Sequence, residues 1–150
     1  MAKNLRERLG PSDPFNTAFI ASVIEDNRLV PFDIQGSVAH ARMLQKVGLV
    51  TKEEGIAIVK GLEQVLAEWE SGKFELDPAF EDVHMNVEHR LGGLTPHAGK
   101  LHTARSRNDQ IALDLRLWMR LESDLLIREI RQAQGALVAL AVKHKNVLMP

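Results

Sequence analysis

The chain has 150 residues and a formal net charge of −1, a balance that argues against a nucleic-acid or membrane-surface binder, which usually carries a basic excess. It contains no cysteine, so there is no disulfide framework and nothing in the composition indicates secretion. Because the sequence also lacks a signal-peptide stretch and any run of about 18 apolar residues that would span a bilayer, we expect a soluble cytoplasmic protein.

The first thirty residues carry an irregular pattern. Pro11 and Pro14 break any early helix. The segment 15–24 fits either a short helix or an extended arm, and it contains Ser22 within an Ala-Ser-Val run.

Two helices are predicted between residue 31 and about residue 71. Pro31 suits the first position of a helix, and Gly48 suits the residue that closes it. Thr51 and Glu54 match a capping box at the start of the second helix, which Ser71–Gly72 ends. Apolar residues recur at steps of three and four in both helices. They are Ile34, Val38, Ala41, Leu44 and Val47 in the first and Ile56, Val59, Leu62, Leu66 and Trp69 in the second.

A third helix is predicted to begin at Asp77–Pro78, a cap followed by a first-turn proline, and to stop at Gly92–Gly93. Its apolar face repeats at steps of four, through Val83, Val87 and Leu91. Residues 92–108 are predicted to form a loop, because glycine, proline, threonine, histidine and cations are concentrated there.

The last predicted helix runs from about residue 109 to residue 145, without a proline. Ser106 and Asp109 match a second capping box at its start. Apolar residues lie on more than one side of this helix, so we expect partner helices from further sequence or from other subunits. The predicted fold is all-α, with a small helical N-terminal domain (residues 1–109) followed by the first long helix of a central bundle (residues 110–150).

A cationic loop, defined here as residues 100–108, is the densest group of chemically useful side chains. Four potential cations fall within eight positions: Lys100, His102, Arg105 and Arg107. The loop leads into a helix N-terminus, whose free amides also favour anions, and Ser106 and Asn108 add neutral hydrogen-bonding groups. The pattern is typical of a site for small carboxylates or phosphates. A solvated loop whose charges pair with nearby acids is an equally good interpretation.

Residues 81–89 combine acids with histidines. His84 and Glu88 are four residues apart and share a helix face, an arrangement in which a carboxylate can orient a proton-transfer group. An ordinary exposed helix face is the interpretation that we favour. The six histidines do not follow the spacing of a zinc site, so no metal site is predicted.

Residues 33–37 form the third candidate. Gly36 inside a helix costs about 1 kcal/mol relative to alanine, which indicates close packing or close backbone approach. Helix–helix packing is the favoured interpretation.

The segment Lys100–Gln110, together with residues 114–118, resembles the first signature region of argininosuccinate lyases and of the delta-crystallins derived from them. Residues 33–41 and 81–84 lie where that family has similar segments. Residues 147–150 resemble those just before the family's second signature. The chain is therefore expected to be an N-terminal portion that ends before most of the catalytic residues.

The sequence departs from the family at two places. Residues 5–10 replace a segment that is usually similar to Trp-Gly-Gly-Arg-Phe. Ala104 replaces a glycine, and alanine permits less backbone freedom.

The resemblance implies β-elimination of argininosuccinate to arginine and fumarate, as part of arginine biosynthesis, in a homotetramer that needs no metal or other cofactor. It implies substrate contacts from Ser22, Ser106, Arg107 and Asn108. It gives supporting positions around them to Asp82, His84, Lys100, His102 and Arg105. The family's acid and base lie in later signatures, so no catalytic residue is expected within this chain, and the chain alone is expected to be inactive.

Three other interpretations stay open at this point. A sibling of the superfamily that releases fumarate, such as adenylosuccinate lyase, fumarase or aspartase, is disfavoured by the run from Ser106 to Gln110. A non-catalytic, crystallin-like protein shares the same sequence pattern. A plain helical interaction module would need the cationic loop to be dispensable.

Overall fold

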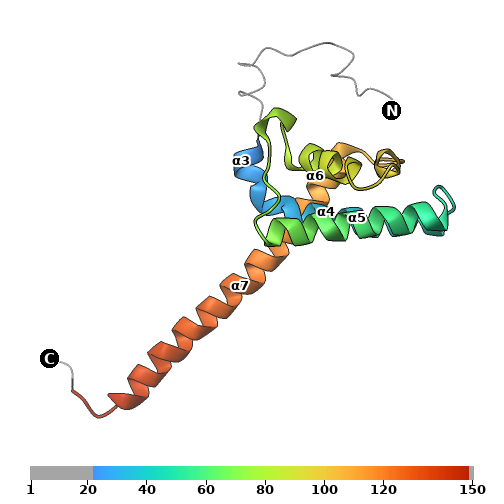
Figure 1. The fold of residues 1–150 in the computed structure, drawn as a ribbon. Helices are drawn as coiled ribbons and strands as arrows, with labels where there is room; N and C mark the ends of the chain where they lie inside the picture. The colour runs from blue at the N-terminus through green and yellow to red at the C-terminus, as the bar shows by residue number, and fades with distance from the viewer. Residues whose placement is uncertain (1–21, 149–150) are drawn as a thin grey trace. The chain divides into compact units, whose positions relative to one another are not determined.

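The computed structural model describes residues 22–148, and every regular element among them is a helix (Figure 1). The predicted all-α class is therefore confirmed. The chain divides into two compact units, Met1–Leu115 and Arg116–Pro150. The atypical segment at residues 5–10 and most of the predicted helix or arm, residues 15–21, lie outside the described residues.

The first long helix, α4 (Val30–Lys46), is entered through the short helix α3 (Val23–Asp26) and the 3-10 turn η1 (Asn27–Leu29). Pro31 is the second residue of α4 and not the first, because η1 already holds the preceding backbone in a helical conformation. Gly48 follows the helix with φ of 78°, a left-handed conformation that glycine adopts without strain. Its predicted role in closing the helix is confirmed.

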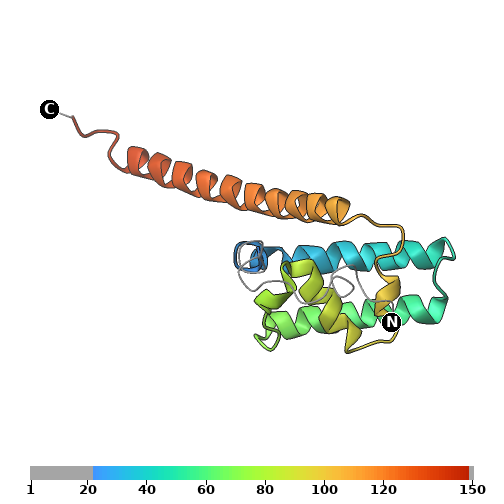
Figure 2. The same ribbon diagram turned by 90° about the horizontal axis from the view of Figure 1, so that it is seen from above.

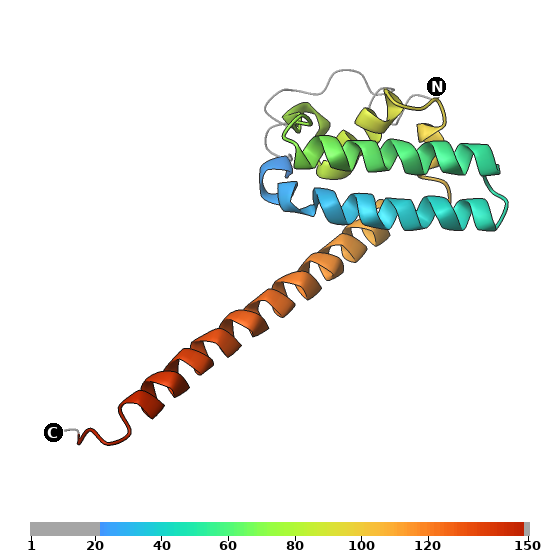
Figure 3. The same ribbon diagram turned by 60° about the horizontal axis from the view of Figure 1, so that its bottom comes forward.

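The second long helix, α5 (Lys52–Glu70), packs alongside α4 (Figures 2 and 3). Its predicted capping box is confirmed. The Glu54 N–H donates to Thr51 Oγ1 at 3.2 Å, and the Thr51 N–H donates to Glu54 Oε2 at 3.0 Å. These two bonds satisfy amides at the start of α5 that have no partner within the helix.

The buried face of α5 agrees with the predicted one only in part. Leu62 is buried, and Val59, Leu66 and Trp69 are partly buried against the core. Ile56 is 41 % exposed, and Val47, just beyond the end of α4, is also exposed. A Cβ atom on Gly61 would lie 2.5 Å from Leu91 Cδ1, so this glycine lets the neighbouring helix approach closely. Counting apolar side chains misses part of this face because glycines belong to it. The buried residues of α5 are Gly55, Ile58, Gly61, Leu62 and Val65.

The single helix predicted from Asp77 to Gly92 is wrong, because the chain forms two pieces there: η2 (Pro78–Phe80) and α6 (Val83–Gly92). Glu81 separates them with φ of 50°. Each piece has its own cap, since the carboxylate of Asp77 accepts the Ala79 N–H at 2.8 Å and that of Asp82 accepts the Met85 N–H at 2.7 Å. The predicted stop at Gly92–Gly93 is confirmed.

Helix α6 packs against α4 and α5, and the core lies among these three helices. Its predicted apolar face is confirmed, since Val83, Val87 and Leu91 are fully buried. The main core residues besides these are Val30, Ile34, Ala41, Ile58, Leu62, Val65 and Leu101. The predicted loop between α6 and the last helix contains the short turn η3 (Ala98–Lys100).

The last helix, α7, runs from Arg107 to Lys143, close to the predicted bounds. Its first turns belong to the unit Met1–Leu115, where Gln110 and Asp114 are buried. A Cβ atom on Gly36 would lie 3.0 Å from Leu113 Cδ2, so the favoured interpretation of Gly36 as a helix-packing position is confirmed.

The second unit consists of the rest of α7 and the residues after it. No side chain between residues 116 and 148 is buried. Its large apolar side chains are exposed instead, and they include Met119, Leu121, Leu126, Ile130, Leu137, Leu140 and Val142. Among the described residues, no helix is long and apolar enough to cross a membrane.

Candidate functional site

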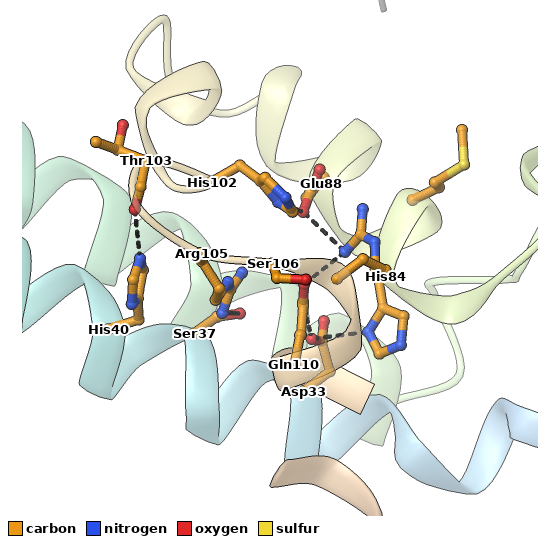
Figure 4. Close-up of polar contacts among 12 residues, drawn as sticks. Asp33, Ser37, His40, His84, Glu88, His102, Thr103, Arg105, Ser106 and Gln110 are labelled. Carbon is orange, nitrogen blue, oxygen red and sulfur yellow. Dashed lines mark hydrogen bonds and ion pairs between the residues drawn. The ribbon is translucent and has the colours of Figure 1, made fainter. Parts of the chain in front are cut away.

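Three ionisable side chains from three helices meet inside the first unit, and we call Asp33, His84 and Asp114 the buried acid cluster. Figure 4 shows the first two of them. His84 Nδ1 donates to Asp33 Oδ1 at 3.0 Å and lies 3.5 Å from Asp114 Oδ2. The residues are 1 %, 3 % and 0 % exposed, respectively. The favoured interpretation of residues 81–89 as an exposed helix face is therefore wrong for His84. It fails because His84 follows Val83 onto the face that packs on α4.

A second layer of polar contacts joins the cluster to the cationic loop. Gln110, which is 2 % exposed, donates from its amide to Asp33 Oδ1. Its amide oxygen accepts from Arg107 Nη1 at 2.6 Å, and the same nitrogen donates to Glu88 Oε1 at 3.0 Å. Glu88 Oε1 also accepts from His102 Nδ1 at 3.2 Å. The orientation of the Arg107 guanidinium is thus fixed by one acid and one amide.

Burial and charge shift the pKa values in the cluster. Burial and the negative charge of Asp33 raise the pKa of Asp114 to about 7, against the opposing charges of His84 and Arg105. Burial by itself lowers the pKa of His84, but the hydrogen bond and charge of Asp33 outweigh burial, so the net shift is upward. Both shifts favour a protonated cluster in the folded state.

The cationic loop lies against one stripe of α4. Asp33, Ser37 and His40 are spaced four and three residues apart, so they share a helix face. Ser37 Oγ accepts from Arg105 Nη1 at 3.1 Å, and His40 Nε2 donates to the Thr103 carbonyl at 2.9 Å (Figure 4). These two contacts hold the loop on α4, and the contact from Gln110 to Asp33 does the same for the first turn of α7.

The structure brings some of the expected substrate residues together and separates others. Ser22 lines a cavity of about 240 Å³ together with Asp82 and His84. Ser106 and Asn108 are exposed at the start of α7, where the Asn108 N–H donates to Ser106 Oγ at 3.2 Å. The hydroxyl of Ser106 therefore caps α7, but through the amide of Asn108. The predicted capping box with Asp109 is not formed in this part of the structure.

Most of the four cations pair with acids in this state of the molecule. Lys100 lies 2.5 Å from Glu54 Oε1, and its partner is thus on α5, whereas the partner of His102 and Arg107 is Glu88. These pairs match the interpretation of a loop whose charges are met by nearby acids. They do not exclude anion binding, because the free amides at the start of α7 are an additional anion-binding feature.

The buried acid cluster also has the side-chain types of a metal site. One possible ligand atom from each of its three members lies within 4.8 Å of the other two. Two features indicate that bound protons and Arg105, and not a metal ion, balance the negative charge of the two carboxylates. Nδ1 of His84 is engaged in the bond to Asp33, and the positive charge of Arg105 acts on both carboxylates.

Sequence reasoning missed Gln110 and Asp114 as buried polar residues. They are four residues apart on α7, so they face the same way, and this spacing was the available signal. Asp33 belonged to a candidate segment, but its partners lie 51 and 77 residues away in sequence. No local pattern predicts such pairs.

A family model described as lyase matches residues 7–150. Three relatives, each named argininosuccinate lyase, come from Ruthia magnifica subsp. Calyptogena magnifica, Thioalkalivibrio sulfidiphilus and Methylococcus capsulatus. They are 49 %, 52 % and 51 % identical to this chain, over 93 % of it and over 29 %, 30 % and 30 % of their own lengths. The chain spans about 30 % of the length of these curated relatives.

Proposed function

We propose, since the chain belongs to the lyase family, that it forms the N-terminal part of an argininosuccinate lyase, which splits argininosuccinate into arginine and fumarate. The observation that carries the proposal is the identity of about half of all residues to proteins of that name, over 93 % of the chain. The geometry of the cationic loop supports it, because a dicarboxylate product needs cations and amide donors at its binding site.

The chemistry of β-elimination explains why such donors are needed. A base removes a proton from the carbon next to a carboxylate, and negative charge then accumulates on that carboxylate. Within this chain, Arg107 and the first amides of α7 offer positive charge at one place, and the exposed Asn108 and Ser106 side chains lie beside them. We assign substrate contacts to these three side chains and to Ser22. We assign neither the base nor the acid to this chain.

The supporting residues lie next to the side chains that are assigned to the substrate. Glu88 and Gln110 orient Arg107, and Asp82 Oδ2 lies 4.0 Å from Arg107 Nε. His84 shares the cavity of Ser22 and Asp82, and it ties that cavity to the buried acid cluster. An arginine held in this way loses little side-chain freedom when a carboxylate binds, which favours affinity.

The other supporting residues lie further from the side chains that are assigned to the substrate. His102 Nδ1 bonds to Glu88, and Lys100 ties the cationic loop to α5. Arg105 lies between the loop and α4, with Ser37 as its partner. These contacts order the loop on which the substrate residues lie.

The assembly and setting belong to the same proposal. We infer a cytoplasmic homotetramer of the whole protein, active in arginine biosynthesis. The exposed apolar side chains of α7 beyond residue 115 support it, because a helix with such a surface needs partner helices. We also propose that residues 1–109 form the N-terminal domain and that residues 110–150 begin the bundle domain.

The deciding experiment measures fumarate release by the natural protein that contains these residues. Argininosuccinate, adenylosuccinate, malate and aspartate are supplied separately, and release from argininosuccinate alone is expected. Asn108→Ala is expected to reduce kcat/KM by at least tenfold, whereas Arg42→Met, on an exposed part of α4, is expected to leave it unchanged. Release from another substrate, or none from argininosuccinate, overturns the proposal.

A further inference from the structure

Arg105 is a cation that lies largely inside the protein, although its loop is on the surface. Burial lowers the pKa of its guanidinium, and the charges of Asp33 and Glu88 oppose that effect. Its Nη1 donates to Ser37 Oγ at 3.1 Å. Its Nε and Nη2 are buried and have no hydrogen-bond partner among the described residues. A buried guanidinium is costly unless it is matched by charge, so its position needs an explanation.

The matching charge comes from the buried acid cluster. Asp33 Oδ2 and both carboxylate oxygens of Asp114 are also buried without a hydrogen-bond partner within residues 22–148. Both carboxylates act electrostatically on Arg105. Two acids and two bases, Arg105 and His84, therefore share one buried region. Removal of Arg105 leaves the two acids with His84 alone as a balancing base.

The backbone next to Arg105 depends on this anchor. Ala104 has φ of 55°, a left-handed conformation that costs alanine about 1–2 kcal/mol. The next residue, Arg105, turns its side chain to Ser37 (Figure 4). Ser106 and Asn108 are exposed. An inward arginine between a strained alanine and outward polar residues fixes which side of the loop faces solvent.

We propose that Arg105 is a positioning residue: its guanidinium anchors the cationic loop to Ser37, beside the buried acid cluster, and thereby holds the exposed Ser106 and Asn108, with the half-buried Arg107 between them, in place for substrate. It touches no reacting atom. The link to substrate rests on the proposed function, whereas the anchoring of the loop does not depend on it.

The test separates anchoring from charge balance by hydrogen exchange on the 150-residue chain. Arg105→Met keeps the aliphatic stem but removes the guanidinium. The backbone amides of Thr103 and Gln110, which bond to Lys100 and Ser106 carbonyls, are expected to exchange at least tenfold faster in this variant. Arg42→Met, which removes an exposed cation of α4, is the matched control and is expected to leave both rates unchanged.

A double variant tells the two roles apart. Arg105→Met is expected to lower the melting temperature, because it leaves the acids without this balancing charge. At pH 8, above the folded pKa of Asp114, Asp114→Asn removes one of those negative charges, so R105M and D114N together are expected to recover much of that loss. The fast exchange at Thr103 is expected to persist, because the anchor is still missing. Recovery of both quantities, or unchanged exchange in Arg105→Met, overturns the proposal.

Activity gives an independent measurement in the natural protein that contains the chain. Arg105→Met is expected to raise KM for argininosuccinate at least tenfold and to change kcat less. In Arg105→Ala, added guanidinium ion at millimolar concentration is expected to restore part of kcat/KM, and an equal concentration of sodium chloride is not. An unchanged KM in Arg105→Met contradicts the positioning role, whereas inactivity of the unmutated protein contradicts only the proposed function.

Discussion

His84 Nδ1 lies 3.0 Å from Asp33 Oδ1, across 51 residues of sequence and with both side chains almost fully buried. This bond joins α6 to α4 through charge and not only through apolar packing. Removal of one partner of a buried ion pair leaves the charge of the other unbalanced, and this buried charge accounts for the loss of stability.

Asp33→Asn is expected to lower the free energy of unfolding by about 3 kcal/mol. The amide cannot balance the charge of His84, although it has nearly the same shape as the carboxylate. Urea unfolding of the 150-residue chain measures the loss. Glu63→Gln is the control, because its pair with Arg42 spans 3.9 Å on the surface and is worth at most about 1 kcal/mol. Equal losses in both variants contradict the prediction.

The stability of the chain is expected to fall as pH rises from 5 to 8. The folded pKa of Asp114 is about 7, against an ordinary value of 3.8, so the folded state binds the extra proton between these values. Stability linked to this proton is complete below the unfolded pKa and is lost as pH rises through about 7. His84 acts in the same sense, because its folded pKa is also raised. Glu68, whose pKa is lowered to about 2, affects the pH dependence of stability only below pH 4.5.

Asp114→Asn isolates this effect, because the amide resembles the protonated carboxyl group and does not titrate. One extra bound proton gives a slope of at most about 1.4 kcal/mol per pH unit. Unfolding free energies measured from pH 5 to 8 are expected to fall less steeply in the variant than in the parent chain. Parallel curves would show that Asp114 does not hold the proton.

Ala104→Gly is expected to stabilise the chain by about 0.5–1 kcal/mol. Glycine adopts φ of 55° without strain, which stabilises the folded state. It also gives the unfolded chain more conformational freedom, which offsets part of that gain. A thermal melt detects the change. Ala67→Gly, in the regular helix α5, is the opposite control and is expected to destabilise by about 1 kcal/mol. Destabilisation by both substitutions contradicts the reading of strain at Ala104.

The 150-residue chain alone is expected to form no measurable fumarate from argininosuccinate. It spans about 30 % of the relatives' length, and the family resemblance assigns the acid and the base to later segments. The assay compares the pure chain with the natural protein that contains it. Fumarate release by the chain alone would contradict this prediction and would require a base among residues 1–150.

Local signals predicted most of the fold. The capping box of Thr51 and Glu54 and the closing glycine at 48 depend on residues within one turn, and both are confirmed. The helix predicted from Asp77 failed because a second cap, at Asp82, competes with continuation of the helix. The face of α5 was predicted only in part because Gly61 contributes a contact through the absence of a side chain.

The candidate site was less predictable than the fold. The cationic loop was identified from its composition, but the inward direction of Arg105 depends on Ser37, which is 68 residues away. His84 looked like a surface residue because charged and polar residues such as Glu81, Asp82 and Glu88 lie close to it in sequence, although Val83 and Met85 flank it directly. Its burial depends on the packing of α6 on α4, which cannot be predicted from local patterns in a single sequence.

Because these partners lie far apart in sequence, the site is assembled in a fixed order as the chain is synthesised. Helices α4 and α5 are close in sequence, so they can pair as soon as both have left the ribosome. The carboxylate of Asp33 has no partner until residue 84, and later residues 110 and 114, have been synthesised. The loop that presents Arg107 and Asn108 is thus among the last parts of the first unit to become ordered. A nascent chain halted before residue 105 would contain both helices but no anchored cationic loop.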